Sequence, residues 1–372
     1  MVDIELKLPD NWFEPEMRCG HLITKKQKEV WAIELDMLNK FKTICQKHNL
    51  TWWVDGGTLL GAVRHQGFIP WDDDIDVFML REDYDKFIEV AKTELTGNYF
   101  LQDDSDYETF YAHAKMRRTD TTAILTKDIP GKFKFNQGIF IDIFPFDNVP
   151  DDPETYTTFI RGLRLDKYHA LKYLNMYRCN HGVVMEDAKK SAVSIMNKYA
   201  KHRTSYNDID TTYCANLGLP SIKYDIRKKK EELAGTIYMK FEMLEVPVPI
   251  EYHDILTRLY GDYMTYAKGT SKHGSIIFST NVSYKDFPFD KFMEKQKELF
   301  PEMYDQYTQY NQYTQYNQYT QYEQTSNKYK NTRDEYAQKY GWDMTGMSFG
   351  DDDDSYSQYS QYCQYTQYEY PQ

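Results

Sequence analysis

The sequence has no run of about 18 apolar residues, which argues against a membrane-spanning helix. Residues 1–20 contain no apolar core, so no secretory signal is predicted and a cytoplasmic location is expected. Basic residues are in deficit, because 45 Lys and Arg face 57 Asp and Glu, a net charge of −12 over 372 residues. Phosphate backbones require a basic surface, so the deficit argues against a general nucleic-acid binder.

Cysteine is scarce. The five cysteines are scattered and form no Cys-x-x-Cys pair: Cys19, Cys45, Cys179, Cys214 and Cys363. A disulfide framework or a zinc site would require paired spacing, so the sequence predicts reduced, structurally inert thiols.

Aliphatic residues nearly disappear after residue 300. Residues 301–372 hold 16 of the 34 tyrosines, largely in Gln-Tyr-x repeats at 306–323 and 357–370. This segment has 11 acidic and 4 basic residues, so it carries −7 of the net charge. With so little to bury, it is predicted to be a disordered tail of the polar and aromatic kind that can self-associate. Residues 1–300 are the predicted globular domain.

The pattern of apolar residues in this domain is mixed. Helices are predicted at 25–48, 58–64, 81–94, 154–203 and 251–266, and strands at 51–54, 74–80 and 139–144. The charge run at 227–232 is interpreted as a solvated helix face. Because strands mix with helices in the first half and helices dominate the second, an α+β domain with a helical extension is predicted.

Four acids lie within five residues: Asp72, Asp73, Asp74 and Asp76. Alternate side chains of a strand share one face, so Asp72, Asp74 and Asp76 are expected to point the same way, about 7 Å apart. Carboxylates this close repel one another unless a cation lies among them, and clustered hard oxygen ligands suit Mg²⁺ or Mn²⁺. An acidic loop that faces water remains the alternative. An EF-hand is disfavoured, because its glycine and terminal glutamate are missing.

A second carboxylate signal lies farther along the chain. Asp142 interrupts the apolar sequence IFIDIF, and burying an unpaired charge there would cost several kcal/mol. A role as metal ligand or base is therefore favoured over a structural one. If strand 139–144 lies beside strand 74–80, Asp142 joins Asp74 and Asp76 around divalent metals.

A glycine turn precedes the acids. Gly56, Gly57 and Thr58 follow a strand and open a helix, where backbone N–H groups can approach a phosphate without a Cβ in the way. A glycine pair alone is weak evidence. A phosphate-binding turn followed by metal-binding carboxylates is more specific, because nucleotide transfer requires both.

Two segments resemble the LicD/fukutin-related family: GGTLLGAVRHQGFIPWDDDIDV from Gly56 and GIFIDIFPFDNVP from Gly138. Residues 115–122 (KMRRTDTT) and 246–264 (VPVPIEYHDILTRLYGDYM) are also similar to segments of that family. The likeness covers residues 25–285 and fades at KHGSII, from Lys272. The tail has no counterpart in the bacterial pattern of the family.

The resemblance implies a nucleotidyltransferase-like fold, a mixed sheet with flanking helices. It also implies a phosphotransferase that moves a phosphorylated alcohol, such as phosphocholine or ribitol phosphate, from a CDP-linked donor to a glycan such as that of a lipopolysaccharide. The implied catalytic and metal-binding carboxylates are Asp74, Asp76 and Asp142, with Asp72 as a further candidate ligand. The implied contacts to the donor phosphates are Gly56, Gly57 and Thr58.

Other polar residues near these motifs are candidates for substrate contact. Arg64, Lys115 and Arg117 could stabilise charge on the transferred phosphoryl group, although surface salt bridges would explain them equally well. His65 is a further candidate. Trp52 and Trp71 are expected to pack, with stacking on a base or a choline cation as the alternative.

Two rival functions remain open at this stage. A glycosyltransferase could bind its metal through an Asp-x-Asp motif and use a nucleotide sugar, but the glycine turn and Asp142 disfavour it. A non-catalytic binding module assembled by the tail is the other rival, and the full set of motif acids argues against it.

Overall fold

The computed structural model describes residues 1–105, 109–125, 135–179, 186–218, 220–221, 225–266 and 276–299. The predicted tail, 301–372, lies outside the described residues. The chain divides into two units, of which the first contains Met1–Phe287 and the second contains Pro288–Cys363. In the second unit the described element is helix α7 (Phe289–Leu299). All that follows concerns the first unit.

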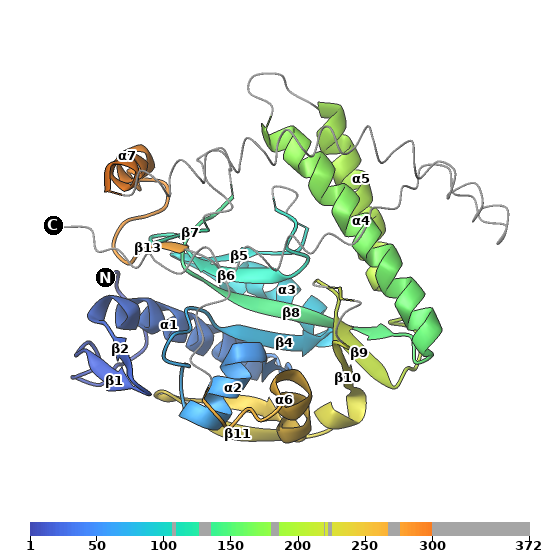
Figure 1. Cartoon of the computed structure of the whole chain (residues 1–372), viewed down its shortest axis with the longest axis horizontal. Helices are drawn as coiled ribbons and strands as arrows, with labels where there is room; N and C mark the ends of the chain where they lie inside the picture. Colours follow the sequence, from blue (N-terminus) through green and yellow to red (C-terminus); the bar gives the residue numbers. More distant parts are fainter. Residues whose placement is uncertain are drawn as a thin grey trace. The chain divides into compact units, whose positions relative to one another are not determined.

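A mixed sheet forms the centre of this unit (Figure 1). Its main path runs β10–β9–β8–β4–β3, with β6 on β8 and β5 on β6. The strands are β3 (Trp53–Val54), β4 (Asp76–Leu80), β5 (Tyr99–Gln102), β6 (Ala114–Arg118), β8 (Phe140–Val149), β9 (Tyr213–Asn216) and β10 (Arg227–Lys229). The predicted strands at 51–54, 74–80 and 139–144 are confirmed as β3, β4 and β8, the first two shorter and the last longer than predicted.

Strand β8 organises the sheet because it has three partners. Along one edge it pairs in parallel with β4, with Asp76 opposite Asp142. Along the other edge it pairs antiparallel with β6 through its first residues and with β9 through its last. Residues 141 and 143 are apolar and fully buried, so the alternation of β8 leaves Asp142 on the opposite face.

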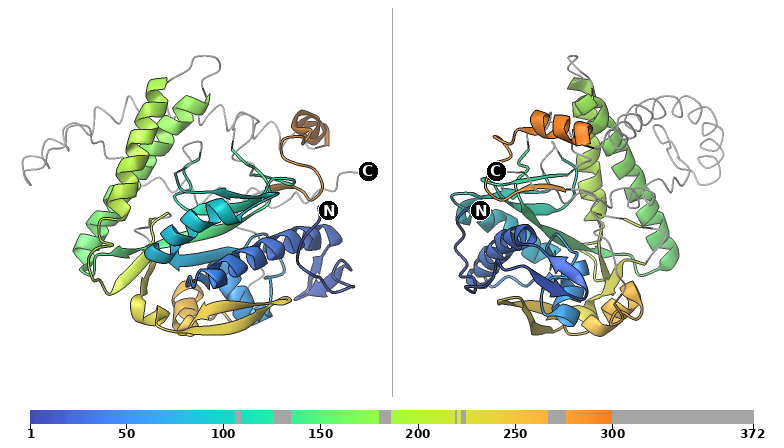
Figure 2. Two further views of the ribbon diagram at one scale, coloured as in Figure 1. Left: turned by 180° about the vertical axis from the view of Figure 1, so that it is seen from behind. Right: turned by 60° about the vertical axis from the view of Figure 1, so that its left-hand side comes forward.

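Helices α1 (Lys25–Lys47) and α3 (Arg81–Glu94) cover one face of the sheet, as the view from behind shows (Figure 2). Both helices match the prediction closely. Thr24 begins α1 by accepting a hydrogen bond from the backbone N–H of Gln27 at 3.2 Å. Trp31, Phe41 and Phe87 fill the core between these helices and the sheet.

The predicted helical extension is confirmed as α4 (Pro153–Cys179) and α5 (Glu186–Arg203), which lie side by side in Figures 1 and 2. A second apolar cluster, which includes Val149, Leu163 and Tyr199, joins these helices to the end of β8. In the parts of the chain that the structure describes, no helix has the length and apolarity needed to cross a bilayer.

Helices hold most of the regular structure in the described parts of the second half, as expected, but the strands of this half were not predicted. Besides β9 and β10, this half contains the hairpin β11 (Thr236–Phe241) with β12 (Leu244–Pro249), and β13 (Ile276–Ser279), which pairs with β7 (Thr122–Leu125). A further hairpin, β1 (Glu16–Arg18) with β2 (His21–Ile23), precedes α1. Helix α6 (Tyr252–Tyr260) ends six residues before the predicted limit, because Gly261 takes a φ of +67° that terminates it.

The interpretation of 227–232 as a solvated helix face is wrong. These residues form β10 and a 3₁₀ turn, η2 (Lys230–Leu233), and Lys228 and Glu232 are buried. Strand alternation directs Lys228 inward, where its Nζ lies 2.8 Å from Asp55 Oδ1. Glu232 accepts two hydrogen bonds from Arg258, at 2.7 and 2.9 Å.

A buried ion pair connects α3 to the far end of β8. Asp147 is fully buried, and its two oxygens accept hydrogen bonds from Arg81 Nε at 2.7 Å and Arg81 Nη2 at 2.9 Å. Asn207 donates a third hydrogen bond to the same carboxylate at 2.8 Å. Arg81 also contacts Asp85 at 3.2 Å, but that carboxylate is largely exposed.

We expect Asp147→Ala to lower the free energy of unfolding by about 3–5 kcal/mol, because it leaves the Arg81 guanidinium buried without its partner. The control is Asp85→Ala, which removes an exposed partner of the same arginine and should cost less than about 0.5 kcal/mol. Urea denaturation followed by circular dichroism measures both. Equal losses in the two variants would contradict this account of the pair.

Candidate active site

Three carboxylates converge where β4 and β8 run side by side. Asp76 and Asp142 are register partners across the parallel pair, and Asp74 lies just before β4. One oxygen of each carboxylate lies within 4.8 Å of the others. Asp74 and Asp142 are buried, with 5% and 7% of their surfaces exposed. The geometry that the sequence required of Asp74, Asp76 and Asp142 is therefore present.

Lys115 reaches the same carboxylate from the other edge of β8. It is the register partner of Asp142 across the antiparallel pair with β6, and its Nζ donates a hydrogen bond to Asp142 Oδ1. His113, two residues earlier on the same face, places Nε2 3.3 Å from that oxygen. Burial alone would raise the pKa of Asp142, but the Lys115 ammonium and the nearby His113 imidazole hold that pKa well below its usual range. Asp142 therefore stays ionised at neutral pH.

The glycine turn lies directly against the acids. A Cβ on Gly57 would come within 2.5 Å of Asp72 Oδ2, and one on Gly56 within 3.3 Å of Asp76 Oδ2. Gly56 also has a φ of +51°, which L side chains rarely adopt. Within α2 (Gly56–His65), the backbone conformation favours glycine at position 56, and a side chain at position 57 would displace the Asp72 carboxylate.

Thr58 has a contact that the sequence did not predict. Its side chain is buried, and its Oγ1 accepts a hydrogen bond from the backbone N–H of Asp76 at 2.9 Å. This bond fixes the start of β4 against the first turn of α2. Contact between Thr58 and the donor phosphates remains a prediction.

The residue before the turn anchors it through an ion pair. Asp55 precedes the first residue of α2 and pairs with Lys228 of β10. The Lys228 ammonium also lies 5.0 Å from the ring centre of Phe78 and 4.5 Å from that of Phe146. Sequence reasoning missed this pair, because it interpreted the whole run around Lys228 as solvated.

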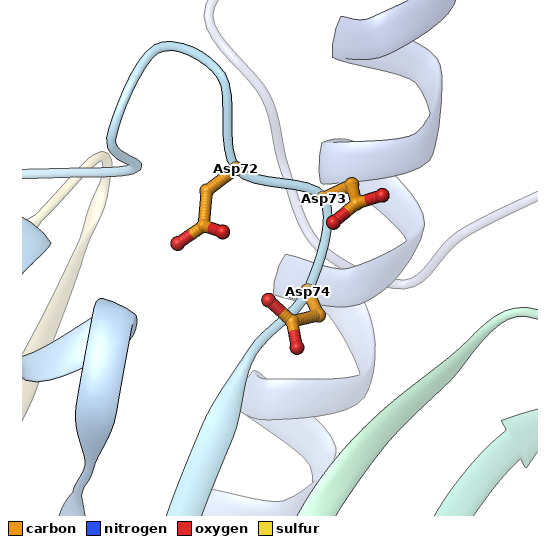
Figure 3. A group of neighbouring side chains, drawn as sticks. All are labelled: Asp72, Asp73 and Asp74. Atoms are coloured by element: carbon orange, nitrogen blue, oxygen red, sulfur yellow. The ribbon is translucent and has the colours of Figure 1, made fainter. Parts of the chain in front are cut away.

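A second group of carboxylates overlaps the first. Asp72, Asp73 and Asp74 also have oxygens within 4.8 Å of one another, and Figure 3 shows them on the loop that leads into β4. The backbone of this loop is fixed to α1, because Trp31 Nε1 donates a hydrogen bond to the Asp72 carbonyl at 3.0 Å. Both groups offer only carboxylate oxygens, a donor set that suits a hard divalent cation such as Mg²⁺.

Glu34 of α1 lies next to this loop and was not predicted. Only 1% of its surface is exposed, and within the described part of the chain its Oε2 has no hydrogen-bond partner. Burial, and then the negative charges of Asp74 and Asp73, raise the pKa of Glu34 well above its ordinary value. A polar residue on the buried stripe of α1 was the available signal, but the stripe alone does not say which element it faces.

Other predicted residues lie elsewhere. Arg64 and His65 are at the opposite end of α2 from the glycine turn, and Arg64 Nη1 donates to the Tyr263 carbonyl at 2.6 Å. Arg117 is buried and donates to Gln102 Oε1 at 2.6 Å and to the Gly138 carbonyl at 3.1 Å. None of these three hydrogen bonds involves the clustered carboxylates, so contact of either arginine with substrate remains a prediction.

The two tryptophans differ in environment. Trp52 is buried with its ring edge-on to Phe41, so its expected packing role is confirmed. Trp71 is only half-buried and lies edge-on to His21, with ring centres 6.3 Å apart.

Glu34→Gln is expected to raise the free energy of unfolding at pH 8, in the presence of a chelator, by more than about 1 kcal/mol. A carboxyl group whose pKa is higher in the folded than in the unfolded state stabilises the fold at pH values below the unfolded-state pKa. This contribution is lost as the pH rises toward the folded-state pKa, at roughly 1.4 kcal/mol per pH unit. The gain should vanish near pH 4. Urea denaturation at both pH values measures it, with exposed Glu89→Gln as the control. A variant less stable than wild type at pH 8 would refute the assignment.

A known protein family matches the segment of the chain that contains these site residues. The family described as "LicD/FKTN/FKRP, nucleotidyltransferase domain" matches residues 49–174, which contain the glycine turn, the acids and Asp142. The Haemophilus influenzae protein named lipopolysaccharide cholinephosphotransferase LicD is 30% identical over 250 residues, covering 64% of this chain and 91% of that protein.

Shorter matches involve two other proteins. Human ribitol 5-phosphate transferase FKRP is 42% identical over 40 residues, which are 11% of this chain and 8% of that protein. The uncharacterized protein RP689 of Rickettsia prowazekii is 60% identical over 37 residues, 10% of this chain and 14% of that protein. The Haemophilus relative is matched over nearly its whole length, and the resemblance seen in the motifs is thereby confirmed: the chain belongs to the LicD family.

Proposed function

We propose that this protein is a metal-dependent phosphotransferase. It moves a phosphorylated alcohol, such as phosphocholine or ribitol phosphate, from a CDP-linked donor to a hydroxyl of a glycan. The observation that carries this proposal is the convergence of Asp74, Asp76 and Asp142 beside the glycine turn. The names of two relatives, a cholinephosphotransferase and a ribitol 5-phosphate transferase, support transfer of this class of group.

Asp74, Asp76 and Asp142 would hold Mg²⁺ or Mn²⁺, and Asp72 is a further candidate ligand. When bound, such a cation supplies charge neutralisation for the donor pyrophosphate. The fit rests on the all-oxygen donor set and on the burial of Asp74, which would be costly for a carboxylate without positive charge nearby. We extend the proposal to the fold, which would be nucleotidyltransferase-like.

Groups of the chain itself would bind the donor phosphates, remove the proton of the acceptor hydroxyl and stabilise charge on the transferred group. The first turn of α2, at Gly56 and Gly57, presents a helix N-terminus without Cβ atoms, which favours the donor phosphates. Asp142 would help to remove the proton of the attacking hydroxyl, which a cation held by these carboxylates would make more acidic. That oxygen forms a bond to the distal phosphorus as the bond to the CMP oxygen breaks, and CMP leaves. Lys115, which contacts Asp142, would stabilise charge on the transferred group.

Donor choice gives the direct test. Incubation with Mg²⁺, a glycan acceptor and CDP-choline or CDP-ribitol is expected to release CMP, measured by chromatography, and chelation should abolish the release. UDP-sugars supplied in parallel should release no UDP. Release of UDP without CMP would instead establish the rival glycosyltransferase and end this proposal.

The carboxylates can be tested one at a time. Asp74→Asn, Asp76→Asn and Asp142→Asn should each lower kcat for CMP release by about 100-fold or more, as expected when one charge-positioning group is removed. The matched control is Asp208→Asn, which changes an exposed acid remote in sequence from the motifs and should retain the wild-type rate. Full activity in any of the three site variants, with an unchanged circular dichroism spectrum, would remove that residue from the proposed centre.

A further inference from the structure

A tyrosine that is both exposed and held in place lies beyond the end of α6. Tyr266 is 56% exposed, yet the Arg64 guanidinium lies 5.3 Å from its ring centre and the His65 ring lies 5.3 Å from it. Arg64 is itself fixed by the Tyr263 carbonyl and by His65 Nε2, which accepts from Arg64 Nε at 3.0 Å. The Tyr266 ring is therefore a platform for a ligand, because Arg64 and His65 hold it in place while more than half of the residue stays exposed.

A second tyrosine connects this platform to the acids. Tyr260, the last residue of α6, is 39% exposed. Burial, and then the charges of Asp55, Asp76 and Asp72, raise the pKa of Tyr260, so its hydroxyl lies within electrostatic reach of these carboxylates. Helix α6 lies beside α2 in all the views of Figures 1 and 2, which agrees with the contact between Arg64 and Tyr263.

We propose that Tyr260 and Tyr266, with His65 and Arg64, form the docking surface for the acceptor glycan, an inference that rests on the proposed function. The C–H faces of a sugar ring can stack on an exposed aromatic ring, and its hydroxyls require hydrogen-bonding groups at the edge, which the imidazole, guanidinium and phenol groups supply. Burial and Arg64 lower the pKa of His65 to about 4, so its ring is neutral at pH 7 and suits an uncharged sugar.

The openness of the surface favours a glycan over the donor base. Nucleotides and other small ligands bind in concave sites that enclose most of their surface. Tyr266 and the neighbouring Met264 are instead more than half exposed, at 56% and 55%, so they suit a chain that crosses the surface. A lipid surface or a protein partner would also cover exposed tyrosines, and the experiment must separate these outcomes.

A glycan array probed with labelled protein, without donor, tests binding independently of catalysis. We expect the wild type to capture at least one oligosaccharide and Tyr266→Ala to bind it about five- to tenfold more weakly, the loss expected for one aromatic stacking contact. Tyr266→Phe should retain binding, because it keeps the ring. Tyr168→Ala, which removes an exposed tyrosine of α4, is the control and should bind normally. Absence of glycan capture by wild type, or equal binding by Tyr266→Ala, would overturn the proposal.

Kinetic measurements with the captured oligosaccharide as acceptor then test the docking surface and the proposed phosphotransferase activity separately. Tyr266→Ala should raise the acceptor KM five- to tenfold while the KM for the CDP-linked donor stays unchanged. A rise in the donor KM instead would assign the surface to the nucleotide and refute the glycan assignment. If wild type captures glycan but releases no CMP from any CDP-alcohol, the proposed function fails while the docking surface stands.

Discussion

The structure depends on how carboxylates are buried in the central sheet. A carboxylate moved out of water needs a positive charge within a few ångströms, or it takes up a proton. Strand β8 carries two such groups, and each has its cation: Lys115 of β6 serves Asp142, and Arg81 of α3 serves Asp147. Because both cations come from other elements, these pairs also fix how β6 and α3 sit against β8.

The same rule explains the region around the glycine turn. Asp55 at the start of α2 is paired with Lys228, which comes from a distant part of the sequence and lies against two phenylalanine rings. The ion pair therefore joins the turn to β10. Glu34 is the exception, since within the described residues no cation pairs with it and its neighbours are themselves acids. It marks the place where negative charge in the fold is in excess, next to the proposed metal ligands.

Local pattern predicted the carboxylates of the site but not the residues that support them. An aspartate in an apolar strand and a second strand that begins with acids were enough to predict that Asp142 and Asp76 lie together, because two buried strands of this kind belong in one sheet. The run of charged residues around Lys228 suggested that this side chain faces solvent. It is buried instead, because side chains alternate between the two faces of the short strand β10. Long-range packing was also hidden, since nothing near Glu34 in the sequence indicates that α1 passes the acid loop, and nothing near Arg64 indicates that it supports a distant tyrosine.

Helix α2 connects the two proposed halves of the reaction. Its first residues meet the acids and its last residues support Tyr266, and its ten residues span about 15 Å at 1.5 Å per residue. In the proposed arrangement, a sugar stacked on Tyr266 would lie near the end of α2 that is opposite the glycine turn. An acceptor bound there would have to extend from that end of α2 toward the carboxylates, which would favour a glycan of more than one residue.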